Sequence, residues 1–488
     1  MLYVIIALLS FVAIGYLIVK RVHAAAAIFF VGVILLMVAA ALGVHEDGGV
    51  TIEPSGNALY DQLLVVDSLF KSRFAGIGMA IMVLFGFVAY MRHIGADAKT
   101  VVVLSKPLAR MKGSYWLVPI GFILGNILSL VVPSASALSL LLIATLLPAL
   151  VAAGLTPLTV GAIVVTSSTI VPTPLEAGLI QGASLTGMPI SEYVFGHVAR
   201  ATVPTIILMA FIHMWWQRRC DRKDAARIAA ASTPAEPGTT GGSGTVEDAE
   251  GTLAVEAPNP AVKEALERAA GLPTFYAAIP LLPLLLIVIT ATLQRLGWLP
   301  FEAGILPATI VSLLIAVIIE MIRHRNIPTT LDSMKSFFLG MGEGAGGVVA
   351  LLVAAAVLVE GITQLGVIKM LTDATTGSHG AAAIIILIFV GATALLATLT
   401  GSGVAPYFAF SEFVPALAAE SGILPVRMLN SIWGTSNLMR QVSPVAAAVL
   451  IVAGAIKVTP LDLVKRTAIP MIGGTILNVL FSFLFITA

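Results

Sequence analysis

Arg440 has the clearest chemical implication of any residue in this chain, because it lies in GTSNLMRQVSP (434–444), between two apolar runs. A guanidinium does not lose its proton in hydrocarbon, and placing it at the centre of a membrane helix costs from roughly 2.5 to about 17 kcal/mol. Its planar fork fits a carboxylate through two parallel hydrogen bonds. We therefore expect Arg440 to bind an anionic substrate. The alternatives are an internal ion pair with Glu412 or Glu176, or a position near the membrane interface.

Four clusters of small polar residues interrupt apolar regions: PSAS (133–136), TSSTIVPTP (166–174), TGSG (400–403) and the stretch around Arg440. Backbone that leaves a helix inside a membrane must line a cavity or be packed in protein, because unpaired peptide groups in lipid cost several kcal/mol. Small residues also simply allow helices to pack closely. For the four clusters together we expect a central substrate site. Its candidate residues are Ser134, Ser136, Ser167, Ser168, Gly401, Ser402, Gly403, Thr435, Ser436, Asn437 and Arg440.

Ion coupling has two sets of candidates. Glu176 and Glu412 lie in apolar surroundings beside the expected site, where a carboxyl group can carry a proton across the membrane. Hydroxyl, amide and free carbonyl oxygens can instead hold sodium, and the candidates for such a site are Ser134, Ser402 and Asn437. The coupling ion, H+ or Na+, is left open by the residues themselves.

Enzymatic chemistry is not indicated. The chain has no nucleophile placed beside a base, no phosphate-binding loop and no Cys/His spacing that suits a metal, so we expect neither an enzyme nor a cofactor. The single cysteine, Cys220, cannot form an internal disulfide.

The composition indicates a polytopic membrane protein. Of the 488 residues, 58% are hydrophobic and 11% are charged, and the mean hydropathy is +1.01, which excludes a soluble globular protein. The net charge of +1 does not suggest a nucleic-acid partner. Uninterrupted runs long enough to cross a bilayer as helix are predicted at 2–19, 24–44, 75–91, 197–216, 273–293, 301–322, 336–364 and 463–487.

Residues 217–272 form the polar interruption of the chain and predict a cytoplasmic flexible linker between two similar halves, 1–216 and 273–488. LPALVAAGLTP (147–157) resembles VPALAAESGILP (414–425), and the polar clusters recur in the same order. We therefore predict that each half contains uninterrupted membrane-spanning helices, a helical hairpin and a broken helix. The hairpins are expected near 114–154 and 380–420, and the broken helices near 158–187 and 426–456.

The basic residues indicate how these halves are oriented. If each half crosses the membrane five times, the second is inverted relative to the first. Placing both termini in the periplasm then puts 20 of the 27 Lys and Arg residues in the cytoplasm and leaves Arg440 alone within the membrane. Inverted repeats with broken helices are typical of secondary transporters.

Three stretches resemble the anaerobic C4-dicarboxylate transporter DcuC family of the ion transporter superfamily: FGFVAYMRHIGADAKTVVVLSKPL (85–108), TGSGVAPYFAFSEFVPALAAESGILP (400–425) and SNLMRQVSPVAAAVLIVAGAIKVTPLDLVKRTAIP (436–470). The resemblance implies succinate, fumarate and malate as substrates, moved by efflux, exchange or ion-coupled transport across a bacterial inner membrane. It also implies an elevator-type homodimer. The residues that match family positions are Ser402, Ser436, Asn437 and Arg440, whereas PSASA and VPTPLEAGL depart from the family pattern.

Other functions stay open at this point. The same fold could carry another organic anion, such as a monocarboxylate, citrate or an aminobenzoyl conjugate. An intramembrane enzyme lacks its catalytic groups in this sequence, an assembly scaffold does not account for so many polar breaks, and a channel would show flux without saturation.

Overall fold

The computed structural model describes residues 2–44, 50–107, 115–231, 260–367, 370 and 381–487, and all the secondary structure in this part of the chain is helical. By length and composition, nine of its helical segments can cross a membrane, which confirms the predicted all-helical polytopic membrane protein. Residues 232–259 of the predicted linker lie outside the described residues.

The described part of the chain forms a series of helices. In chain order they are α1 (Leu2–Val19), α2 (Ala24–Ala41), α3 (Ala58–Arg73), η1 (Phe74–Gly78), α4 (Met79–Ile94), α5 (Ala96–Ser105), α6 (Leu117–Leu128), α7 (Ala135–Ala152), α8 (Pro157–Val165), α9 (Ala177–Thr186), η3 (Glu192–Val198), α10 (Ala199–Ala231), α11 (Pro260–Ala270), η4 (Thr274–Leu281), α12 (Leu282–Arg295), α13 (Ile305–His324), α14 (Ile327–Ser333), α15 (Lys335–Gly344), η5 (Ala345–Val349), α16 (Ala350–Gln364), α18 (Ala381–Thr400), α19 (Ala405–Ser411), α20 (Val414–Ser421), α21 (Pro425–Met439), η6 (Arg440–Val442), α22 (Ala447–Ala455) and α23 (Pro460–Phe485).

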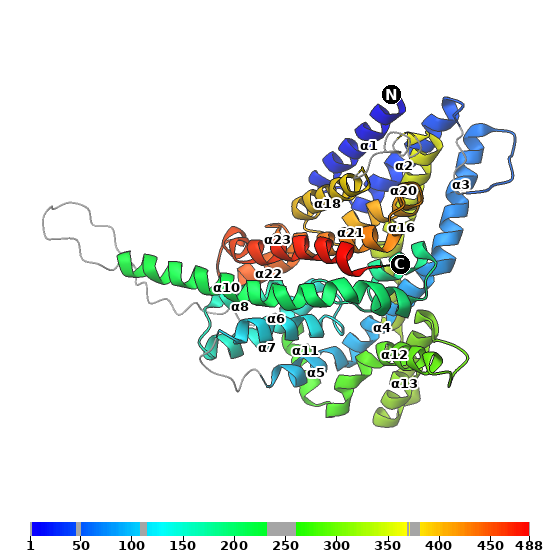
Figure 1. The fold of residues 1–488 in the computed structure, drawn as a ribbon. Coiled ribbons are helices and arrows are strands. Elements are labelled where there is room, and N and C mark those ends of the chain that lie inside the picture. Colours follow the sequence, from blue (N-terminus) through cyan, green and yellow to red (C-terminus); the bar gives the residue numbers. More distant parts are fainter. Residues whose placement is uncertain are drawn as a thin grey trace, which may run out of the picture.

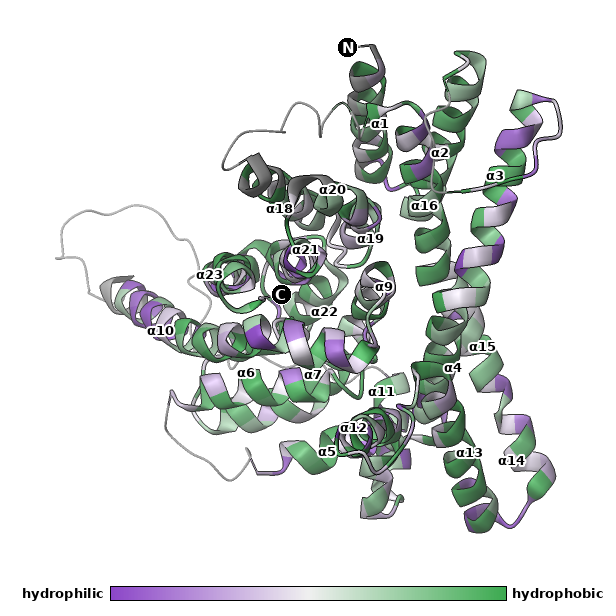
Figure 2. Cartoon of the chain, turned by 45° about the vertical axis from the view of Figure 1, so that its right-hand side comes forward, coloured by the Kyte–Doolittle hydropathy of each residue, from purple (hydrophilic) through white to green (hydrophobic). Residues whose placement is uncertain are grey.

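Two long rods form one side of the molecule (Figure 2). The first joins α3, η1 and α4, the second joins α14, α15, η5 and α16, and each contains a π-helical turn near its middle. They run antiparallel, because α4 packs along α15 while α3 meets α16. Glycines allow the close approach, since a Cβ on Gly340 would lie 2.4 Å from that of Ala89. The glycine-rich stretch around Glu343 is thus a site of close helix contact.

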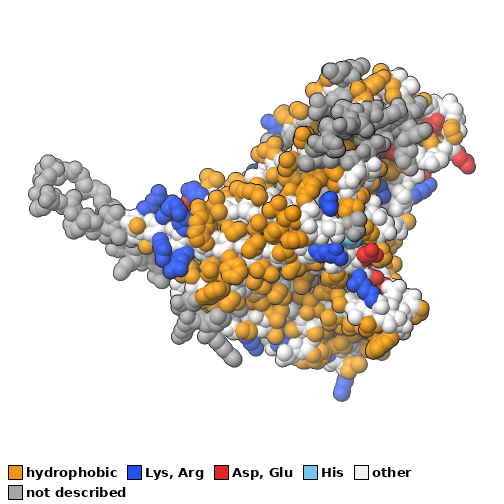
Figure 3. Space-filling model, in the orientation of Figure 1, with side chains coloured by type: hydrophobic (Ala, Val, Ile, Leu, Met, Phe, Trp, Pro, Cys, Tyr) orange, Lys and Arg blue, Asp and Glu red, His pale blue; other side chains and the backbone are white. Residues whose placement is uncertain are grey.

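The remaining large body holds the broken helices and two pairs of consecutive helices, α6 with α7 and α18 with α19, which are called the first and the second hairpin. Helices α10 and α23 pack along each other through its centre, and α21 packs on α23 (Figure 1). Helix α10 continues to Ala231, so the first residues of the predicted linker are helical. Its projecting end carries Arg218, Arg219, Arg222 and Lys223, and Figure 3 shows basic side chains there beside a broad hydrophobic surface.

Two helices are interrupted close to one another in space. After α8 the chain is not helical until α9, because Pro172 and Pro174 cannot continue a helix. The second interruption begins later than its sequence suggests: α21 continues to Met439, and the helix is lost only at Ser443 before Pro444. Residues 435–437 therefore lie in the last turns of a helix, whereas residues 166–168 lie at the start of a break.

Candidate functional site

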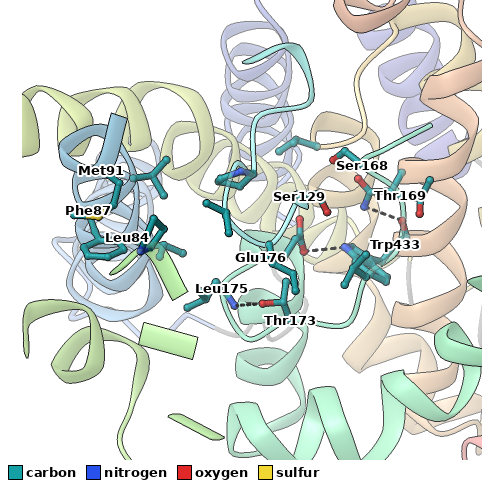
Figure 4. Close-up of a pocket in the computed structure, with 18 of the residues that line it drawn as sticks. Leu84, Phe87, Met91, Ser129, Ser168, Thr169, Thr173, Leu175, Glu176 and Trp433 are labelled. Atoms are coloured by element: carbon teal, nitrogen blue, oxygen red, sulfur yellow. Dashed lines mark hydrogen bonds between the residues drawn. The ribbon is translucent and has the colours of Figure 1, made fainter. Parts of the chain in front are cut away.

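A cavity of about 100 Å³ lies between the first break, the end of α21 and the first rod. Its apolar wall comes from α4 and includes Leu84, Phe87 and Met91. Figure 4 shows these side chains facing the opposite wall, which carries the polar groups. Those polar groups are Ser129, Ser168, Thr169, Thr173, Glu176, Asn437 and Arg440. The cavity is therefore amphipathic, with one polar and one apolar side.

Arg440 begins η6 and reaches across to the first break. Its Nη2 donates to the carbonyl oxygen of Ser168 at 3.0 Å and to the hydroxyl of the same residue at 3.1 Å. Its Nε is buried without a hydrogen-bond partner, and Arg440 forms no ion pair with any carboxylate among the described residues. Gly403 lies against the side chain, where an added Cβ would be 2.7 Å from the Arg440 Cδ. The guanidinium thus keeps hydrogen-bonding capacity for a ligand.

The second hairpin and both breaks are joined around Arg440. The Ser168 carbonyl also accepts from Gln441 Nε2 at 2.6 Å. The hydroxyl of Ser436 donates to the carbonyl of Gly403 at 2.7 Å, which fixes the hairpin tip on α21. Gly401 has a φ of +69°, and its position against Ala446 leaves no room for a side chain. These contacts hold the polar wall in one arrangement.

Asn126 on α6 fixes the first hairpin to the first break. Its Nδ2 donates to the carbonyl of Thr166 at 3.2 Å, and its Oδ1 accepts from the backbone N–H of Thr169 at 3.2 Å. Asn126 therefore orients Thr169 at the cavity. Asn126 was not among the predicted site residues, although an amide alone in the apolar stretch LVPIGFILGNIL is a usable signal.

Glu176 lies at the other end of the first break, in the polar wall. It caps the amino terminus of α9, since its Oε2 accepts from the backbone N–H of Leu179 at 2.8 Å. The same oxygen accepts from Trp433 Nε1 at 2.8 Å (Figure 4). These two hydrogen bonds hold the carboxyl group at the start of α9. Trp433 is thus a second residue of the site that the sequence analysis did not predict.

Glu412, the other predicted coupling candidate, has a different environment. Its side chain forms an ion pair with Arg73 Nη2 at 2.7 Å and accepts from Gln181 Nε2 at 2.8 Å. Glu412 does not line the cavity. The alternative ion pair between Arg440 and Glu412 is therefore not formed.

A second arginine is deeply buried in the protein. Arg466 on α23 is 4% exposed and forms ion pairs with Asp221, at 2.6 Å, and with Asp224. Its burial escaped notice because the sequence places it among solvated basic residues at a span end.

The other predicted residues lie around the cavity without lining it. Ser134 is an exposed cap of α7, and Ser136 follows it in the first turn. The hydroxyl of Ser167 bonds to its own helix at Ile163, and that of Thr435 bonds to Ser431. Ser402 caps the turn that leads into α19. Of the three residues suggested for sodium, Asn437 lines the cavity, whereas Ser134 and Ser402 do not.

Helices long enough to cross a membrane, with two helix interruptions beside a cavity that carries polar groups, are typical of membrane transporters. Two solved structures share this fold. The YdaH transporter of Alcanivorax borkumensis matches with a TM-score of 0.57 at 17% identity, covering 95% of this chain and 99% of that one. MtrF of Neisseria gonorrhoeae matches with a TM-score of 0.56 at 11% identity, covering 96% and 97%.

The family follows from closer relatives. Residues 2–487 match the family DcuC, described as C4-dicarboxylate anaerobic carrier. A probable anaerobic C4-dicarboxylate transporter DcuC of Vibrio cholerae is 31% identical over 485 residues, which are 98% of this chain and 96% of the relative. DcuC of Escherichia coli K12 is 31% identical over 455 residues, 93% and 91% of the two chains. The chain belongs to the DcuC family, which confirms the resemblance, and it is a transporter and not an enzyme.

Proposed function

We propose that this chain is a secondary active carrier of C4-dicarboxylates, with succinate, fumarate and malate as its substrates. The observation that carries the proposal is Arg440, a guanidinium that faces a cavity, lacks an ion-pair partner among the described residues and has an unpartnered buried Nε. An anionic substrate can accept hydrogen bonds from the guanidinium donors that the described residues leave unpaired. The names of the family and of its relatives support a dicarboxylate.

In the proposed complex, Arg440 binds one carboxylate through its free donors. Asn437 offers a donor to the second carboxylate, because its Nδ2 carries two hydrogens and gives only one of them, to the carbonyl of Trp433 at 3.2 Å. The hydroxyls of Ser129 and Thr169 already donate to Asn126 and make this wall polar without adding a free donor. The carbon chain between the carboxylates lies against Phe87 and Leu84 of α4. A short substrate with charge at both ends and an apolar middle suits a small cavity of this kind.

The proposal extends to the architecture. The antiparallel rods, each with a central π-helical turn, support two inverted repeats, 1–216 and 273–488. The packing of α2 on α16 and of α13 on α4 has the pattern that such repeats produce. We propose that the body with the hairpins and broken helices moves against the rods in an elevator-type homodimer of the inner membrane, with periplasmic termini and a cytoplasmic linker.

Counterflow of labelled succinate in proteoliposomes tests the function. Excess unlabelled succinate, fumarate and malate are expected to compete, whereas acetate, lactate, citrate and aminobenzoyl conjugates are not. Arg440→Ala is expected to lower the transport rate at limiting substrate by roughly a hundredfold or more, because a buried charge pair is lost. Arg295→Ala, at an exposed end of α12, is the matched control.

Two outcomes would contradict this proposal. Unchanged transport and affinity in Arg440→Ala would show that the site is wrong. Competition by citrate or by an aminobenzoyl conjugate, without competition by the C4-dicarboxylates, would assign the chain to another organic anion.

A further inference from the structure

We propose that Glu176 is the counter-charge of Arg440 in the empty carrier and that it binds a proton when the dicarboxylate arrives. This inference rests on the proposed function, because it assumes a dianionic substrate on Arg440. On this inference, Glu176 is the residue that allows the empty carrier to return across the membrane.

The first argument is the position of Glu176. It lines the same cavity of about 100 Å³ as Arg440 and approaches from the opposite end of the first break. The bonds from Leu179 and Trp433 to its Oε2 hold the carboxylate in place without cancelling its charge. Opposite charges that line one small cavity inside a protein interact more strongly than charges in bulk water, because the effective dielectric constant is lower there.

The second argument is that neighbouring buried charges are already compensated. Glu412 has Arg73, and Arg466 has Asp221 and Asp224. Neither Arg440 nor Glu176 forms an ion pair with any residue in the described part of the chain. The two uncompensated groups of the polar wall are therefore left to balance each other.

The third argument is the charge of the cavity in each state. Arg440 and an ionised Glu176 together carry no net charge, so the empty site can move through the membrane at low electrostatic cost. A bound dianion satisfies Arg440 and leaves Glu176 beside an excess of negative charge. A like charge nearby favours protonation of a carboxyl group, so the loaded site takes up a proton from the water that admits the substrate and releases it on the other side.

The groups around Glu176 are consistent with this role. Tyr407 of α19 donates to the carbonyl of Gly178 at 2.9 Å, and its ring lies beside Glu176 and Trp433. Tyr193 of η3 packs on Gly182 of the same helix, α9. From α3, Arg73 is engaged by Glu412. Arg440 is therefore the positive group that faces the Glu176 carboxylate across the cavity.

The test separates exchange from net transport in proteoliposomes. Glu176→Gln keeps the cap and the acceptor for Trp433 but leaves the empty cavity with the charge of Arg440. We expect this variant to exchange labelled succinate at a rate within about threefold of the wild-type rate. Its rate of net succinate uptake driven by a pH gradient should fall by roughly tenfold or more. Its exchange should also lose the pH dependence of the wild type. Glu267→Gln, on the exposed face of α11, is the matched control and should retain both activities.

A second measurement does not depend on the variant. Succinate added to the purified wild-type protein in weak buffer, read with a pH dye, should draw about one proton per bound dicarboxylate, and none in Glu176→Gln. Net uptake by Glu176→Gln equal to that of the wild type, or loss of exchange in a folded Glu176→Gln, would overturn the inference, as would substrate binding by the wild type without proton uptake. A wild type that exchanges no dicarboxylate would instead overturn the proposed function.

Discussion

Arg440 and Arg466 are both buried arginines in the second half of the chain, yet their surroundings are opposite. Arg466 meets the carboxylates of Asp221 and Asp224, and its Nη1 also donates to Gln217 and Thr159. Among the described residues, the Arg440 side chain donates hydrogen bonds to Ser168 alone, and it faces a cavity. The comparison teaches that burial of a charge does not by itself mark a binding site. The unfilled hydrogen-bonding capacity of the charge does.

The network of Arg466 also has an evident structural task. Asp221 accepts from Tyr115 before α6, from Thr156 and Thr159 at the start of α8, and from Arg466 of α23. It therefore joins α10 to the first hairpin, the first broken helix and the final helix. Saturated networks of this kind hold elements in place and leave nothing for a ligand.

The largest expected effect is on stability, from Arg466→Gln. Removal of the guanidinium leaves Asp221 buried without its partner, which costs about 3 to 5 kcal/mol. Thermal unfolding in detergent measures the loss. Asp221→Asn in the same background should restore part of it, since the amide removes the uncompensated charge and its oxygen can still accept from Tyr115 and Thr159. If Arg466→Gln melted at the wild-type temperature, Arg466 would not be the structural arginine of the pair.

Arg440→Lys should show the reverse pattern. The positive charge stays but the fork is lost, so we expect the affinity for succinate to fall about tenfold to a hundredfold while thermal stability is unchanged. Counterflow kinetics and melting curves on one preparation measure both. A variant that melts early and still transports would mean that Arg440 is the structural arginine.

Gly403→Ala tests the packing that positions Arg440. The added Cβ would lie 2.7 Å from the Arg440 Cδ and 3.0 Å from Asn437 Oδ1, so the side chain has to shift. We expect a loss of about 1 to 2 kcal/mol in substrate binding, measured as the concentration of succinate at half-maximal counterflow. Gly342→Ala, which has open space around it, is the control. Equal affinities in the two variants would argue against a fixed guanidinium.

The smallest effect is expected from Ser168→Ala. This change removes one of the two bonds from Ser168 to Arg440 and leaves the one to the carbonyl. A single hydrogen bond to a charged group contributes about 1.5 to 3 kcal/mol at most, and the second bond retains part of it, so a fall of roughly threefold to tenfold in affinity is expected. Inactivation as complete as that of Arg440→Ala would mean that Ser168 itself contacts the substrate.

Sequence reasoning reached most of the fold because hydropathy and helix-breaking residues act locally. A bilayer requires long apolar helices, and proline prevents their continuation at Pro172, Pro174 and Pro444, so spans and breaks can be read without knowing what lies beside them. Arg440 was found in the same way, because a permanent charge in an apolar run is conspicuous. The order of the polar clusters also placed both breaks near one site.

The partners of the charged residues could not be read in this way, because they come from segments hundreds of residues apart. Glu412 pairs with Arg73 and not with Arg440, and Arg466 pairs with Asp221, which lies in the helical first part of the predicted linker. Likewise, Trp433, Asn126 and the apolar wall of α4 join the site through packing that no local pattern contains. Hydropathy and backbone chemistry thus determine which segments enter the membrane and where they break. Which charges remain free to bind a substrate depends on the contacts that long-range packing creates.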